Sequence, residues 1–189
     1  SPLLLDTGLL AAPYPKLFRR AAIGAVRFDA RLAINEDVLF NIQFLQNTSA
    51  IYCLDGVYYK QYDTESGSLS RRLRGDLLDA EAVTRPVLEA FLTDAKLPAP
   101  EIDRLVQISR VRAALNQYGL LTGCPGRMPF AQRRQLFARI LQDADARAAL
   151  RARLTADPNR LLALPYRLGV FLHSAWLLAA YTQLKNRFL

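Results

Sequence analysis

Apolar positions recur along the chain at helical spacing and divide it into a series of predicted helices. The first long one covers residues 36–46, because Asn35 is a suitable cap and four apolar residues share one face: Val38, Leu39, Ile42 and Leu45. A helical turn is predicted over 19–24. Later helices are predicted over 75–95 with a kink at Pro86, over 102–121, from Pro129, from a cap at Asp145, after the cap Asp157, and from Pro165 to near Leu189.

A strand-forming pattern follows the helix over residues 36–46. Two short runs rich in β-branched and aromatic residues, 51–54 and 57–62, flank the turn dipeptide Asp55-Gly56, which predicts a β-hairpin. The predicted fold class is therefore mainly α with minor β: a short β-hairpin and the helix over 36–46, followed by a helical bundle. We divide the chain into residues 1–72, which carry the hairpin, and residues 73–189, which are helical.

The charge of the chain favours anionic partners. Its net charge is +8, and most of the basic residues are Arg. Nucleotides, phospholipid headgroups and lipid-linked phosphates would all suit such a surface, and a merely solvated basic surface is an equally good interpretation. No stretch reaches the roughly 20 apolar residues that span a bilayer.

The two cysteines indicate a reducing compartment. Cys53 and Cys124 are far apart in the sequence and have no His partners nearby, which argues against a disulfide framework or a zinc site. We therefore expect buried, reduced thiols in a cytoplasmic protein. The chain starts at Ser1 rather than Met, so we expect it to be a piece of a longer protein.

Five short motifs follow one another between residues 15 and 70. They are Lys16-Leu17-Phe18-Arg19, Phe28-Asp29, Glu36-Asp37 before an apolar helix, Val57-Tyr58-Tyr59, and Ser66-Gly67-Ser68-Leu69-Ser70. Their order resembles the second half of family 2 glycosyltransferases with the GT-A fold. The resemblance covers roughly the first 70 residues. It implies transfer of a sugar from a nucleotide sugar to a glycan or a lipid-linked acceptor.

Within that resemblance, Asp37 matches the catalytic base. Such a base removes the proton of the acceptor hydroxyl while this oxygen attacks the anomeric carbon, and a single displacement inverts that carbon. Glu36 would orient a loop or contact the acceptor sugar. Without the resemblance, Asn35-Glu36-Asp37 is an ordinary acidic helix start, which the helix dipole stabilises.

The resemblance also implies phosphate-binding residues. Lys16 and Arg19 would face the donor diphosphate, since cationic side chains pair well with phosphate oxygens. Ser68 and Arg71 would belong to a loop over the pyrophosphate. A solvated basic turn and ordinary turn chemistry are the alternative interpretations of these two segments.

Donor and metal binding are expected to lie outside this chain. The family binds its sugar nucleotide on an N-terminal half, where an Asp-x-Asp element holds Mn²⁺ or Mg²⁺. The only such string here, Asp143-Ala144-Asp145, follows the Glu36-Asp37 pair instead of preceding it, so we do not assign it to metal. We expect no metal on this fragment and no turnover without the missing half. The partners expected are that half and a sugar acceptor.

The last predicted helix suggests a function of another class. It carries Leu168, Phe171, Leu172 and Trp176 together with flanking Arg and Lys residues, a pattern typical of a helix on an anionic membrane surface. The region from residue 75 would then be a non-catalytic interaction or membrane-docking module at the inner face of the cell membrane. A core helix is the alternative, and we expect His173 to lie in its core or at an interface. No nucleic-acid motif is present, and we expect no nucleic-acid partner.

Overall fold

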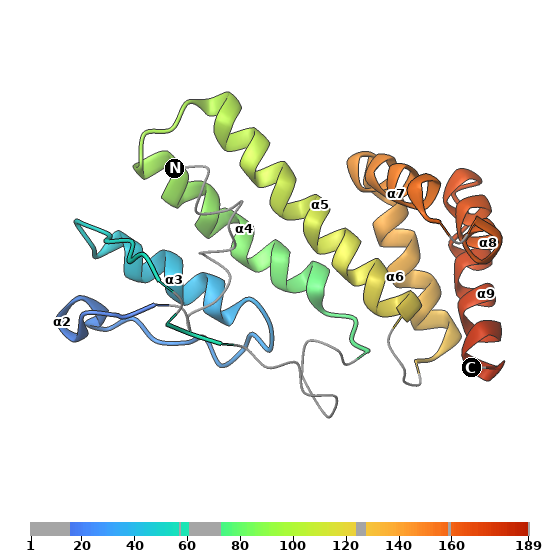
Figure 1. Cartoon of the computed structure of the whole chain (residues 1–189), viewed down its shortest axis with the longest axis horizontal. Helices are drawn as coiled ribbons and strands as arrows, with labels where there is room; N and C mark the ends of the chain where they lie inside the picture. The colour runs from blue at the N-terminus through green and yellow to red at the C-terminus, as the bar shows by residue number, and fades with distance from the viewer. Residues whose placement is uncertain (1–15, 57, 61–72, 124–127, 159, 189) are drawn as a thin grey trace. The chain divides into compact units, whose positions relative to one another are not determined.

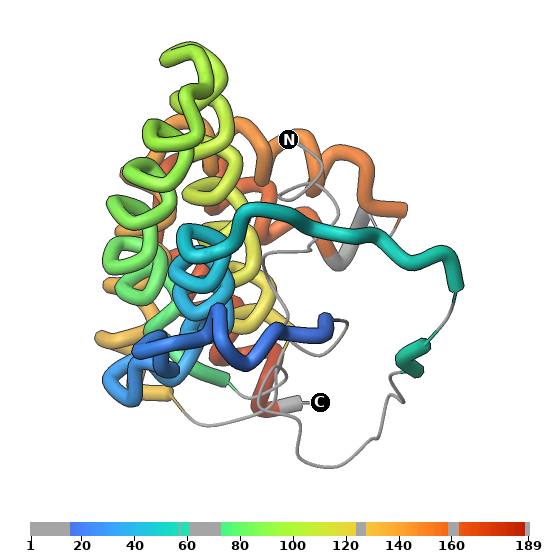
Figure 2. The backbone as a smooth tube through the Cα atoms, turned by 90° about the vertical axis from the view of Figure 1, so that its left-hand side faces the viewer, coloured from blue at the N-terminus to red at the C-terminus, as the bar shows by residue number. Residues whose placement is uncertain are grey.

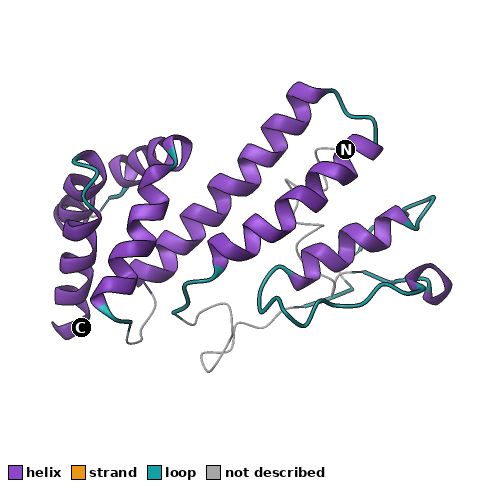
Figure 3. Cartoon of the chain, turned by 180° about the vertical axis from the view of Figure 1, so that it is seen from behind, coloured by secondary structure: helices purple, strands orange, loops and turns teal. Residues whose placement is uncertain are grey.

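The computed structural model describes residues 16–56, 58–60, 73–123, 128–158 and 160–188. These residues form eight helices, α2 to α9, and none of them lies in a strand (Figure 3). The helical part of the predicted fold class is confirmed. The chain packs as two compact units (Figure 1). The first comprises the described residues of Ser1–Asp63 with Asp79–Ser109, and the second those of Thr64–Leu78 with Arg110–Leu189.

The first unit is organised around α3. It contains α2 (Arg20–Ile23), α3 (Glu36–Gln46), most of α4 (Leu77–Asp94) and the first part of α5 (Ala99–Gly123). In Figure 2, α4 and α5 run side by side, joined by a short turn. The core of this unit combines one residue of α3 with two each from α4 and α5: Ile42, Leu88, Leu92, Ile102 and Leu105. The predicted bounds of α3 are confirmed, and Pro86 lies inside α4.

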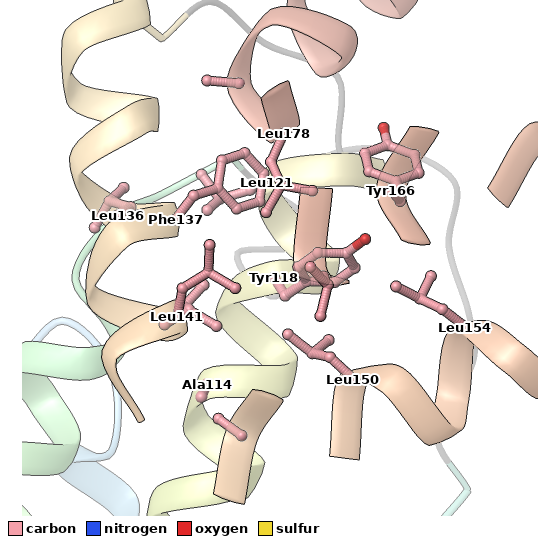
Figure 4. Packing of buried hydrophobic residues seen from close by; sticks show 14 residues of the cluster. Ala114, Tyr118, Leu121, Leu136, Phe137, Leu141, Leu150, Leu154, Tyr166 and Leu178 are labelled. Carbon is pink, nitrogen blue, oxygen red and sulfur yellow. The ribbon is translucent and has the colours of Figure 1, made fainter. Parts of the chain in front are cut away.

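The second unit is a helical bundle built on the rest of α5. Its other helices are α6 (Phe130–Gln142), α7 (Ala144–Ala156), α8 (Arg160–Phe171) and α9 (Ala175–Phe188). Helix α9 packs against α6 and α8, and α7 also packs against both of them. Figure 4 shows the core, where the ring of Tyr118 meets those of Phe137 and Tyr166 edge to face, with centroids 5.9 and 6.1 Å away. These rings and the surrounding leucines exclude water from the centre of the bundle.

Two cations from other helices cap the C-terminal end of α5. The buried Arg133 guanidinium of α6 donates to the carbonyl of Leu121 at 2.8 Å, and Lys185 Nζ of α9 donates to that of Thr122 at 3.2 Å. The last carbonyls of a helix have no partner within the helix and carry partial negative charge. Burial lowers the pKa of Arg133. These contacts therefore tie α6 and α9 to the end of α5.

The predicted β-hairpin is wrong for the residues that can be judged. None of residues 51–56 and 58–60 lies in a strand; Val57, Gln61 and Tyr62 lie outside the described residues. The apolar side chains of this segment are largely exposed: Tyr52 is 87% exposed and Tyr58 is 76% exposed. A strand pair gains its stability from burying one face, and an isolated hairpin is marginal in water. The strand-forming composition here has no covering surface within the described residues. Cys53 is exposed with the rest of the segment, so the predicted burial of its thiol is wrong, and Cys124 lies outside the described residues.

Two helix boundaries also differ from the prediction. The N-cap of α7 is Asp143 rather than Asp145, because the Asp143 carboxylate accepts from the backbone N–H groups of Asp145 and Ala146. The predicted last helix from Pro165 is two helices, and Pro165 lies inside α8.

The break between α8 and α9 has a local cause. His173 takes the left-handed conformation (φ 52°), and Ser174 N–H donates to the carbonyl of Gly169, which ends α8 in a Schellman motif. Ser174 Oγ then accepts from Leu177 N–H and caps α9. His173 is consequently exposed in a turn, so of the two predicted positions the core is wrong and the interface stays a prediction.

Candidate functional site

Asp37 occupies the second position of α3 and is half-buried. Its Oδ1 accepts a hydrogen bond from the backbone N–H of Val38 at 2.8 Å. Burial raises the pKa of Asp37, and the neighbouring Glu36 charge raises it further, whereas the Val38 N–H and the Lys16 ammonium lower it. A carboxylate with a raised pKa is a stronger base than an ordinary surface Asp.

Lys16 lies close enough to Asp37 for their charges to interact. Burial lowers the pKa of Lys16, and the Asp37 carboxylate acts in the opposite direction. Both groups are partly withdrawn from water, which strengthens their attraction. The sequence motifs proposed Asp37 as the base and Lys16 as a phosphate ligand, and the structure brings these two residues together.

A cluster of phenylalanines holds the segment around Lys16 against α3. The Phe18 ring meets the rings of Phe40 and Phe44 edge to face, with centroids 5.5 and 4.8 Å away. Phe28 stacks on Phe40 at 4.4 Å with an interplanar angle of 8°. Such pairs stabilise beyond the area that they bury. Because Phe18 and Phe28 come from two of the sequence motifs and Phe40 from a third, the cluster fixes all three motifs in one place.

The other predicted site residues are less constrained. Glu36 is partly buried beside Asp37, at the first position of α3. Arg19 is exposed and precedes α2, so its guanidinium is accessible to solvent. Ser68 and Arg71 lie outside the described residues. Asn35 stands at the N-cap of α3 as predicted, but it is left-handed (φ 63°) and its side chain makes no capping bond.

Asp29 of the Phe-Asp motif is engaged in a local ion pair. Its carboxylate accepts from the Arg31 backbone N–H and from the Arg31 guanidinium, with a shortest distance of 2.7 Å. These bonds hold the pKa of Asp29 at about 2. The Leu32 N–H also donates to the Asp29 carbonyl, which closes a turn. Asp29 therefore shapes the loop before α3.

The Asp143-Ala144-Asp145 string is committed to the fold. Arg110 Nε lies 2.9 Å from Asp143 Oδ2, and Arg110 Nη2 lies 2.6 Å from Asp145 Oδ2. Asp143 also caps α7 through its other oxygen. Within the described ranges, no three His, Cys, Asp or Glu side chains group as a metal site would require. These carboxylates do not fit a metal-binding role.

The sequence interpretation missed the phenylalanine cluster as a part of the site. An aromatic residue in each of three motifs was the available signal, but only the fold brings the rings together.

In comparisons with known proteins, no family model, no curated protein and no solved structure matches the chain. The described helices include none whose length and apolar character would let it cross a membrane.

Proposed function

We propose that this chain is the acceptor side of an inverting glycosyltransferase, with Asp37 as its catalytic base. The observation that carries the proposal is a half-buried carboxylate with a raised pKa at the start of α3, with Lys16 beside it. The family resemblance of the first 70 residues supports the same assignment. The convergence of three of its motifs on the phenylalanine cluster is an additional argument.

In the proposed reaction, Asp37 takes the proton of an acceptor hydroxyl. The acceptor oxygen attacks the anomeric carbon, and the bond from that carbon to the nucleoside diphosphate breaks with its electron pair on the phosphate oxygen. One displacement inverts the anomeric centre. The Lys16 ammonium favours the ionised form of Asp37, and the exposed Arg19 guanidinium is accessible to a donor phosphate.

The proposal includes a donor-binding half outside this chain and a location in the cytoplasm. Any Mn²⁺ or Mg²⁺ would belong to that half, since the carboxylates of Asp143 and Asp145 are occupied by Arg110. No step of the proposed reaction therefore depends on a metal held by these residues.

The experiment measures sugar transfer from a panel of nucleotide sugars, catalysed by the longer protein that contains this chain. Asp37→Asn keeps the size of the side chain and an acceptor for the Val38 N–H, so it isolates the proton transfer. We expect turnover to fall on the order of a hundredfold or more. The matched control is Asp55→Asn, at an exposed position outside the cluster, which should leave turnover unchanged. Near-normal turnover of Asp37→Asn would remove this residue from the mechanism.

The pH dependence of the transferase activity is a second test of the same site. The base must be ionised to act, and burial raises the pKa of Asp37. Activity should therefore be lost as the pH falls through a value above that of an ordinary Asp. The Lys16 ammonium lowers the pKa of Asp37, and Lys16→Met removes this cation. The pKa of Asp37 should therefore rise in this variant, and the acidic limb of the activity profile should move to higher pH.

A further inference from the structure

We propose that the corner between α8 and α9 docks on an anionic membrane surface, a property that goes beyond the proposed transferase chemistry. Helix α8 carries apolar residues on two sides. One side, with Ala163, Tyr166 and Val170, is buried in the second unit. The other consists of Leu164, Leu168 and Phe171, with Leu172 directly after the helix; these four residues follow one another at helical spacing and remain exposed.

A further exposed apolar residue, Trp176, follows closely in the sequence at the start of α9. Phe171 is 68% exposed, Leu172 is 60% exposed, and Trp176 is 55% exposed. We call Leu164, Leu168, Phe171, Leu172 and Trp176 the α8–α9 patch. A helix with two apolar sides can bury only one of them in its own core, so the other needs a second nonpolar environment. Five large apolar side chains at one corner therefore require a partner, whereas single exposed leucines do not.

The positive charge around the patch indicates that its partner is anionic. Residues 110–189 contain thirteen Arg or Lys and three Asp, a net charge of +10, whereas residues 1–109 carry −2. One of these cations stands directly at the patch: the Arg151 guanidinium lies 5.7 Å from the centre of the Phe171 ring, and its Nη2 is 3.0 Å from His173 Nε2. Arg167 lies on α8 between the buried and the exposed stripe. Apolar side chains flanked by arginines match a bilayer whose headgroups are negative.

The same charge argues against a second copy of this chain. Two copies of residues 110–189, each with a net charge of +10, would repel each other if they were brought face to face, and the three acidic residues of this region offer little compensation. The tryptophan adds a positive argument, because indole rings favour the boundary between lipid headgroups and acyl chains. A lipid surface thus accounts for the apolar residues, the arginines and Trp176 together.

Trp176 is the single tryptophan of the chain, so the patch contains its own reporter. The full chain is titrated with vesicles of phosphatidylcholine alone and with vesicles in which about a third of the lipid is phosphatidylglycerol. We expect a blue shift of the emission, and quenching by lipids brominated on the acyl chains, only with the anionic vesicles. The shift should weaken as salt is raised, because salt screens the attraction.

Two variants separate the apolar and the charged contributions. The triple variant Leu168→Gln, Phe171→Gln, Leu172→Gln keeps the reporter and should lower the vesicle partition coefficient by roughly tenfold for each inserted side chain. Arg151→Gln should lower it about fivefold. The matched control is Val83→Gln on α4 in the first unit, whose side chain is 49% exposed against 47% for Leu168. It should bind vesicles as the unchanged chain does, and circular dichroism checks that every variant is folded.

Three results would overturn the proposal. The first is no emission shift with anionic vesicles at low salt. The second is unchanged vesicle binding by the triple variant. The third is a concentration-dependent dimer in sedimentation that the triple variant abolishes, which would assign the patch to a second copy. None of these measurements depends on sugar transfer, so the transferase proposal and this one fail separately.

Discussion

Replacing Gln117 with Met should destabilise the second unit strongly. Gln117 is fully buried on α5, and its amide bonds two backbone groups at the start of α4. Nε2 donates to the Arg74 carbonyl at 2.7 Å, and Oε1 accepts from the Leu77 N–H at 3.2 Å. Methionine has nearly the same length and flexibility but cannot make either bond. The substitution therefore leaves the buried Leu77 N–H and the partly buried Arg74 carbonyl without this partner.

The magnitude follows from those two groups. A buried backbone group that loses its hydrogen-bond partner costs about 1–3 kcal/mol, and the 3.2 Å bond to Leu77 belongs at the lower end of this range. Burying a thioether in place of an amide recovers roughly 1 kcal/mol. The expected net loss is about 2–4 kcal/mol in the free energy of unfolding.

Urea denaturation followed by Trp176 emission measures this loss, because the only tryptophan lies in the same unit as Gln117. The control is Gln135→Met, an exposed position on α6 in the same unit, which should change the free energy by less than about 0.5 kcal/mol. If Gln117→Met were as mild as this control, the two hydrogen bonds would not be important to the fold, and the reasoning would be refuted.

Three further changes test other features. Arg133→Met leaves the Leu121 carbonyl uncapped and should cost about 1–3 kcal/mol in urea denaturation. Lys96→Gly should stabilise by about 0.5–1 kcal/mol in thermal denaturation, since Lys96 is left-handed (φ 58°) and glycine adopts this conformation without strain. Arg31→Gln should raise the pKa of Asp29 from about 2 toward its ordinary value in an NMR titration. Because that pKa is depressed in the folded chain, the pair stabilises above the ordinary carboxyl pKa and loses its effect as the pH falls toward about 2.

The helices were predictable because their apolar spacing, prolines and caps are local signals. The bounds of α3 agree with the position of Asn35 and with the apolar face, although the Asn35 side chain makes no capping bond. The break between α8 and α9 was missed because it depends on a left-handed His173, where sequence rules look for Gly or Asn. Ser174 was a visible cap, but the apolar run around it favoured a continuous helix.

The β-hairpin prediction was wrong because strand pairing, unlike helix formation, depends on more than local signals. Residues 51–60 have strand-forming composition, yet a strand needs a partner, and composition does not say whether the chain supplies one. The candidate site was partly predictable. Sequence motifs named Lys16 and Asp37, but only the packing of Phe18 and Phe28 on α3 brings these charged groups together. Contacts between residues so far apart in sequence have no local signature.

The raised pKa of Asp37 allows a test of the two interpretations of the acidic start of α3. An Asp that merely complements the helix dipole would stay solvated, and the dipole would lower its pKa. Burial has the larger effect here and raises the pKa, so the ionised form costs the folded chain stability once the pH exceeds the ordinary carboxyl pKa. Asp37→Asn should therefore increase the free energy of unfolding at neutral pH and lose this advantage in acid. A substitution that stabilises the fold while it abolishes sugar transfer is the behaviour expected of a catalytic base, whereas a loss of stability at neutral pH would identify Asp37 as a structural residue.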